Sequence, residues 1–431
     1  MNHPPAEENL SSSPLNLHAE YLPNIRQVSL QIALPRSADP TPQISLSESR
    51  RAVTVSVSAS RSENGYGISE TIKLPARVAP SSARILSARR AENGMTTGTR
   101  ELSYRMQVDD DVTQRSPVDE LMDSFVPWAA GDMSGFTKLR CRRCDGVILD
   151  EPASASASAP PESDKEKWGW IWKDLPSGNW AEMMDFWHCH KPDPPEDHGS
   201  GGAPRQVEDV NSNIKGYGAS NQVLASPGTV LVDVATFLVS EQECKGVEKD
   251  SEELICKCGA LIGVEDPVAK GRRLFKTSLS AGSPSTEDDG ETSWESHPAE
   301  LVVAAQLLEL IERESARRFI VHCGNADGLL IWVFNPDMRY STSSSEHSIT
   351  SQRAMKIFFQ VTHKAEDMLH PEPGKTSSLS MEELRLPKDT FNGLSNALEA
   401  SNGMLPQSAR TFQREWRVGI LPRLERTKRQ S

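Results

Sequence analysis

Two short stretches that each contain two cysteines, CRRCDGVIL (141–149) and CKCGALIGV (256–264), decide how the middle of this chain folds. A glycine follows the second cysteine in each stretch, after Asp145 in the first and directly in the second, and an apolar run typical of a strand comes next. A turn of this kind aims both sulfurs at one point, and two such turns supply the four thiolates that tetrahedral Zn²⁺ prefers. We therefore predict a zinc ion held by Cys141, Cys144, Cys256 and Cys258.

The two stretches differ in one respect, because CKC has one residue between its cysteines where CRRC has two. They are also separated by more than a hundred residues. An ion that closes so long a loop contributes its binding free energy to folding, so the predicted role of the zinc is structural. The alternative is that these are buried free cysteines. If the four sulfurs lie too far apart for one ion, Cys189 and His190 are the next candidate ligands.

A second group of reactive side chains lies in WHCHKP (187–192). On an extended segment His188 and His190 share one face and Cys189 points to the other, so the three cannot easily bind one ion. Three interpretations stay open: a supplementary zinc ligand, a structural cluster packed by tryptophans, or a nucleophilic cysteine activated by a neighbouring histidine. Under the last interpretation Cys189 is a catalytic candidate.

Two further cysteines stand apart from these groups. Cys244 lies in the charged stretch EQECKGVEKD, which predicts an exposed free thiol. Cys323 ends the strand-like RFIVHC beside His322, and adjacent strand residues point to opposite faces, which favours a buried core cysteine over a catalytic pair. Catalysis by Cys323 is the minor alternative.

Composition narrows the class of protein. The 431 residues include 60 acidic and 47 basic ones, a net charge of −13, which disfavours direct contact with nucleic acid. Seven cysteines without a secretory signal do not suggest a disulfide framework, and no apolar run is long enough to span a membrane. We expect a cytoplasmic or nuclear protein that is neither exported nor embedded.

The pattern of apolar residues predicts an α+β protein in several regions. These are a disordered start (1–20), a β-rich sandwich or barrel (21–115), a zinc-stapled middle region with internal linkers (116–276), a disordered acidic, Ser-rich linker (277–297) and an α+β C-terminal region (298–431). In the tryptophan-rich stretch 168–194, packing in a core or between domains is favoured over stacking on a ligand or partner.

Individual elements follow from the same pattern. Strands are predicted at 24–34, 52–60, 66–74, 83–90 and 101–108, within 223–239, and at 318–323, 329–335 and 415–421. Helices are predicted at 117–128, 298–318, 353–363 and 392–400.

Several of these segments together resemble the HECT-like ubiquitin-ligase family that binds ubiquitin-conjugating enzymes. The resemblance rests on CRRCDGVIL, NWAEMMDFWHCHKPDP, CKCG, RFIVHCGNADGLLIWVFNP and FQREWRVGIL. It implies a transferase that accepts ubiquitin from a charged conjugating enzyme and passes it to substrate lysines and to itself. It also implies cyclin binding and a link to the pre-mRNA 3′-end processing machinery. The family pattern falls on Cys141, Cys144, Cys189, His190, Cys256 and Cys258, and less closely on His188 and Cys323.

The resemblance leaves two hypotheses about mechanism. A true HECT domain forms its ubiquitin thioester on a cysteine near the end of the chain, and no cysteine follows Cys323 here. Under the first hypothesis the protein is a ligase that forms a thioester on Cys189 or Cys323, or one that only positions the charged conjugating enzyme. Under the second it is a non-enzymatic, zinc-stabilised scaffold that supports partners such as the 3′-end processing factors.

Overall fold

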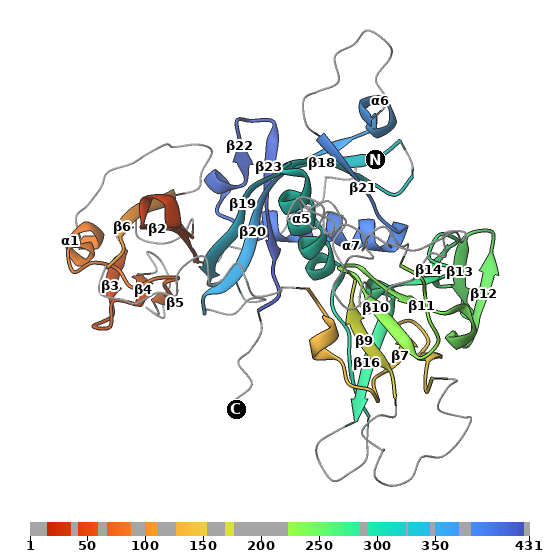
Figure 1. Cartoon of the computed structure of the whole chain (residues 1–431). Helices are drawn as coiled ribbons and strands as arrows, with labels where there is room; N and C mark the ends of the chain where they lie inside the picture. The colour runs from red at the N-terminus through yellow and green to blue at the C-terminus, as the bar shows by residue number, and fades with distance from the viewer. Residues whose placement is uncertain are drawn as a thin grey trace, which may run out of the picture. The chain divides into compact units, whose positions relative to one another are not determined.

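A computed structural model describes residues 15–35, 42–58, 67–87, 100–109, 126–152, 169–175, 223–284, 292–324, 326–344, 350–369 and 381–425. They fall into two compact units: Met1–Phe125 together with Ala316–Ser431, and Val126–Ser315. Figure 1 shows the elements of both. No helix in these ranges is both long and apolar enough to cross a membrane.

The N-terminal part of the first unit is a sandwich in which a three-stranded sheet packs against one end of a nine-stranded sheet. Alternation of apolar and polar residues builds it: in β2 every second residue is buried, from Val28 to Leu34, and in β4 from Val53 to Val57. The buried faces of β1, β2 and β6 pack against those of β3, β4 and β5, with one core between them. The elements are β1 Asn16–Leu22, β2 Gln27–Leu34, β3 Gln43–Leu46, β4 Ala52–Val57, β5 Ile68–Lys73, α1 Ser82–Ser87 and β6 Arg100–Gln107.

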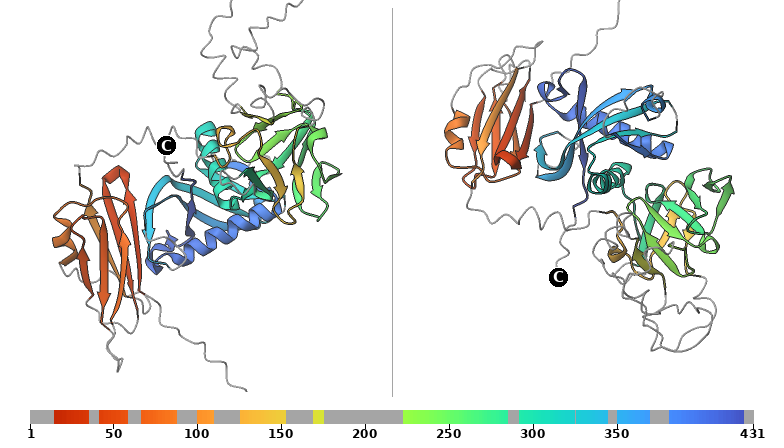
Figure 2. Two further views of the ribbon diagram at one scale, coloured as in Figure 1. Left: turned by 90° about the horizontal axis from the view of Figure 1, so that it is seen from below. Right: turned by 45° about the horizontal axis from the view of Figure 1, so that its top comes forward.

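The C-terminal part of the first unit extends the sheet that contains β1, β2 and β6. β1 pairs antiparallel with the end of β19, so the two ends of the chain share a nine-stranded sheet. The helix α7, blue in the left view of Figure 2, packs along β23 so closely that a Cβ at Gly419 would lie 2.7 Å from Leu398 Cδ2. The elements are β18 Arg318–His322, β19 Gly328–Thr342, β20 Gln352–Thr362, α6 Ala365–Leu369, β21 Met381–Arg385, α7 Lys388–Met404, β22 Thr411–Phe412 and β23 Trp416–Pro422.

The second unit packs a seven-stranded sheet against a four-stranded one around a core that includes Trp128, Phe237 and Trp170. Of the tryptophan-rich stretch only residues 169–175 are described, and their two tryptophans pack in or beside this core as expected. Trp170 Nε1 donates to the Asp150 carbonyl (2.7 Å), and Trp172 Nε1 donates to the Ser134 carbonyl (2.8 Å). The elements are β7 Lys138–Cys141, β8 Val147–Leu149, β9 Ile171–Asp174, β10 Thr229–Val232, β11 Thr236–Val239, β12 Val247–Asp250, β13 Glu253–Cys256, β14 Leu261–Asp266, β15 Gly271–Phe275, β16 Leu279–Pro284, β17 Thr292–Glu295 and α5 Ala299–Glu314.

The predicted α+β class is confirmed, but two elements were assigned the wrong type. Residues 353–363, predicted as a helix, form strand β20, because a strand buried on both faces has apolar residues in succession and loses its alternation. Residues 83–90, predicted as a strand, include helix α1, which starts after Pro80 and Ser81. Only the last three residues of the predicted helix 117–128 are described, and they begin a turn.

The expectation of disorder was also wrong in two places. β1 begins at Asn16, inside the expected disordered start 1–20. The expected linker 277–297 contains β16 and β17, which pair with each other, and β16 also pairs with β7. Gly282 lets the ring of Trp294 cover the hairpin, since a Cβ there would lie 2.8 Å from that ring. The serine-rich, acidic composition of this segment predicts disorder. The hairpin is ordered by one cross-strand contact and by pairing with β7, and composition does not reveal either.

A lysine is fully buried in the core of the second unit. Lys276 Nζ donates to the carbonyls of Pro127 (2.8 Å) and Trp128 (3.4 Å) and lies 5.1 Å from the centre of the Phe237 ring. Burial disfavours the charged ammonium and lowers the pKa of Lys276 to about 7, against the opposing pull of acidic groups such as Asp233. Through these hydrogen bonds Lys276, which directly follows β15, holds Pro127 and Trp128 at the start of the unit.

This burial predicts a pH dependence. Between about pH 7 and the ordinary lysine pKa of 10.5, the unfolded chain holds a proton at Lys276 that the folded chain lacks, so the free energy of unfolding rises with pH. The unaltered protein should therefore gain thermal stability relative to Lys276→Met as the pH rises from 7 to 10, measured by circular dichroism. The exposed Lys173→Met is the matched control. A stability difference that does not change with pH contradicts this account.

Candidate metal centre

The first pair of cysteines lies on the hairpin formed by β7 and β8. Cys141 ends β7, and its N–H donates to the Gly146 carbonyl at 2.8 Å, while Asp145 N–H donates back to the Cys141 carbonyl at 2.9 Å. Asp145 adopts a left-handed conformation with φ +58°, which turns the chain directly behind Cys144. The turn points both sulfurs away from the hairpin toward one place.

The second pair lies on the hairpin formed by β13 and β14, in the same arrangement shortened by one residue. Cys256 ends β13, its N–H donates to the Ala260 carbonyl at 2.8 Å, and Gly259 N–H donates to the Cys256 carbonyl at 2.7 Å. The left-handed residue is again the one after the second cysteine, here Gly259 with φ +80°. The CKC spacing is therefore a tighter version of the same turn.

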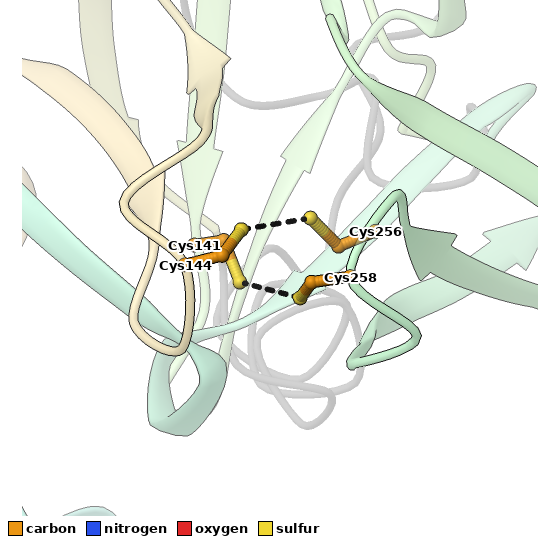
Figure 3. A group of neighbouring side chains, drawn as sticks. All are labelled: Cys141, Cys144, Cys256 and Cys258. Carbon is orange, nitrogen blue, oxygen red and sulfur yellow. Dashed lines mark hydrogen bonds between the residues drawn. The ribbon is translucent and has the colours of Figure 1, made fainter.

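The four sulfurs meet as predicted (Figure 3). Cys141 Sγ lies 3.8 Å from Cys258 Sγ, and Cys144 Sγ lies 3.6 Å from Cys256 Sγ. All four sulfurs lie within 4.8 Å of one another. A tetrahedral ion with metal–sulfur bonds of about 2.3 Å requires sulfurs about 3.8 Å apart. The four cysteines lie close enough to bind one metal ion, and no further ligand is needed to complete the set.

The environment of the thiols favours such an ion. Cys141 and Cys256 are buried, whereas Cys144 is exposed. Burial raises the pKa of Cys141, and it raises the pKa of Cys256 to about 12, so these thiols stay protonated unless a cation offsets the loss of hydration. A hydrogen bond from the backbone of Ala260 lowers the pKa of Cys258 to about 7. A divalent cation would stabilise all four thiolates together.

Side chains around the first hairpin hold it against its neighbours. The Arg140 guanidinium pairs with Asp145 (3.0 Å) and lies 4.2 Å from the centre of the Trp294 ring. The Arg142 guanidinium donates to the His297 carbonyl at 2.9 Å. Sequence reasoning missed these supporting residues, because Trp294 and His297 fall in or at the edge of the segment expected to be disordered.

The other predicted site residues are not part of this cluster. Cys189, His188 and His190 lie outside the described residues. Cys244, predicted to be exposed, is half-buried beside the core of the second unit, and burial raises the pKa of its thiol to about 11. Cys323 follows β18 in the first unit and is also half-buried. Four of the described cysteines therefore form the centre, and two do not.

The geometry predicts a bound metal ion that depends on Cys256. The protein purified without chelators should contain about one equivalent of metal per chain by plasma mass spectrometry, because four thiolates converge on one point. Cys256→Ser should lose most of that metal and lower the thermal stability, while Cys244→Ser should retain it. Equal metal content in the two variants, or none in the unaltered protein, contradicts the assignment.

Two fungal proteins are similar to this chain. The chain is 26% identical to the uncharacterized protein YJR141W of Saccharomyces cerevisiae over 251 residues, 58% of this chain and 62% of that protein. It is 26% identical to the uncharacterized protein C1734.10c of Schizosaccharomyces pombe over 313 residues, 70% of this chain and 78% of that protein. No solved structure matches the chain.

The match to a protein family covers nearly the whole chain, including both cysteine hairpins and most of the sheet of the first unit. It extends over residues 20–418. The protein belongs to the HECT-like ubiquitin-conjugating enzyme (E2)-binding family.

Proposed function

We propose that this protein binds a ubiquitin-conjugating enzyme charged with ubiquitin and promotes transfer of the ubiquitin to lysines of a substrate and of the protein itself. The observation that carries the proposal is membership of an E2-binding family across residues 20–418. Cyclin and the 3′-end processing factors stay predictions that rest on the resemblance alone.

We assign the metal centre a structural part in this function, with zinc as the ion. Four cysteine thiolates fill a tetrahedral site and leave no position for water or substrate, which is the arrangement of structural rather than catalytic zinc. The ion would hold the β7–β8 hairpin to the β13–β14 hairpin, and so keep the second unit folded. The ubiquitin chemistry would then take place elsewhere.

Cys323 is the candidate ubiquitin acceptor among the described residues. Its sulfur would attack the thioester carbonyl of the charged conjugating enzyme, forming a new carbon–sulfur bond as the enzyme's own sulfur departs and takes up the Cys323 proton. Of the two described cysteines outside the metal centre, Cys244 is disfavoured, because burial raises the pKa of its thiol to about 11. Cys323 lies at the end of β18, where the chain leaves the sheet.

One observation favours a version without a thioester. The neighbouring imidazole is already engaged: Gly324 N–H donates to His322 Nδ1 (3.2 Å), so Nε2 carries the proton and donates to Glu383 Oε1 (2.7 Å). His322 is therefore not placed to take a proton from Cys323. In this version the protein positions the charged conjugating enzyme, and the lysine attacks that enzyme's thioester directly.

A transfer assay separates these versions. The full chain is mixed with a conjugating enzyme charged with fluorescent ubiquitin and run on gels with and without reducing agent. The thioester version predicts an adduct that reducing agent removes, that Cys323→Ala abolishes and that the matched control Cys244→Ala retains. Cys189→Ala is run beside them.

The outcomes point in different directions. Lysine ubiquitylation that survives both Cys323→Ala and Cys189→Ala contradicts the thioester version and supports positioning. No transfer with any member of a panel of conjugating enzymes contradicts the ligase proposal and leaves the non-enzymatic scaffold.

A further inference from the structure

Aromatic side chains gather on one face of the C-terminal sheet. Alternation along paired strands puts Trp332 of β19 opposite Phe358 of β20 on the face away from Ile331, Phe359 and α7. The rings of Phe412 and Trp416, from β22 and β23, lie 6.1 Å from Trp332, and Phe412 stacks on Phe358 at 4.4 Å. We call Trp332, Phe334, Phe412 and Trp416 the aromatic patch.

A bulge in β19 exposes one residue of this patch, Phe334. Val333 pairs with Ile357 and Asn335 with Lys356, so Phe334 is an extra residue between them. Bulges re-aim side chains. The Phe334 ring lies 4.9 Å from Phe358 and 6.2 Å from Trp332, yet 49% of Phe334 is exposed. Trp332, Phe412 and Trp416 are half-buried around it. Aromatic residues that pack against the protein core on one side and are exposed to solvent on the other are typical of protein-binding surfaces.

The rim of the patch carries positive charge on a protein whose net charge is −13. The exposed Arg318 guanidinium lies 5.1 Å from the centre of the Trp332 ring, and the exposed Arg414 lies in the turn between β22 and β23. Neither arginine has a carboxylate partner within the described part of the chain. The exposed Glu415 beside Arg414 is the acidic residue of this turn. An apolar centre with unpaired guanidinium groups at its edge complements an apolar side chain flanked by carboxylates.

We propose that the aromatic patch is the surface on which the ubiquitin-conjugating enzyme docks, through an apolar residue of that enzyme flanked by acidic ones. The proposal rests on the proposed function, which supplies the partner, and adds the surface that receives it. Phe334 would make the central contact with the apolar residue of the conjugating enzyme. Arg318 and Arg414 would form ion pairs with carboxylates of that enzyme. Aromatic and arginine side chains are the residue types that dominate binding energy at interfaces.

Binding is measured by biolayer interferometry between the full chain and each of a panel of purified conjugating enzymes. For the enzyme that binds, Phe334→Ser should raise the Kd at least about tenfold, the loss expected for a central aromatic contact. Arg318→Glu should also weaken binding and reduce its dependence on salt. The control is Val361→Ser, which changes a 57% exposed residue on the opposite face of β20.

The results separate this inference from the proposed function. Thermal melts of the variants verify that each is folded, which is expected because the substituted side chains are exposed. If the unaltered chain binds an enzyme and Phe334→Ser and Arg318→Glu bind it equally well, the docking surface is wrong and the E2-binding function stands. Weakening by Val361→Ser as strong as that by Phe334→Ser also overturns the assignment. If the unaltered chain binds no enzyme of the panel, the function and the surface both fail.

Discussion

Four thiols on two hairpins, paired across 112 and 117 residues of sequence, converge within 4.8 Å in the second unit. The β7–β8 hairpin belongs to the four-stranded sheet, and the β13–β14 hairpin belongs to the seven-stranded one. A metal ion that joins them adds its binding free energy to folding. The residues between the hairpins lengthen the loop that the ion closes, but closure entropy grows only with the logarithm of loop length. The site therefore tolerates a long insertion.

Much of this centre could be predicted from sequence, because the relevant signals are local. Each cysteine pair, its left-handed residue and the strand behind it lie within nine residues, and turn chemistry is set at that range. The reason why CKC can match CRRC appears only in the structure. Gly259 and Asp145 each adopt a left-handed conformation and close the turn, and the turn at Gly259 is one residue shorter.

What the sequence did not reveal depends on partners distant in the chain. β20 has apolar residues on both faces, and nothing within it tells that α7 covers one face and aromatic rings the other. β16 and β17 are ordered through Trp294 and β7, against the indication of their own composition. The pairing of β1 with β19 joins residues more than three hundred positions apart. Local patterns contain no information about such contacts.

The metal centre and the features that we propose for ubiquitin transfer lie in different units. The four cysteines of the centre lie in the second unit, whereas both features proposed for ubiquitin transfer lie in or beside the sheet of the first. Strand β18 has Arg318, at the rim of the aromatic patch, at one end, and Cys323 follows its other end. Five residue-to-residue steps along extended backbone separate these two by about 17 Å. A conjugating enzyme docked on the patch would thus lie on the strand that leads to the candidate acceptor.

We propose that four cysteines, and no other residues, hold one zinc ion. X-ray absorption at the zinc edge of the purified full chain measures the number and kind of these ligands. Four thiolate ligands predict a first shell of four sulfurs at about 2.3 Å. A shell that contains a nitrogen or oxygen ligand at about 2.0–2.1 Å, as a histidine such as His190 would supply, or a protein that holds no zinc, would contradict it.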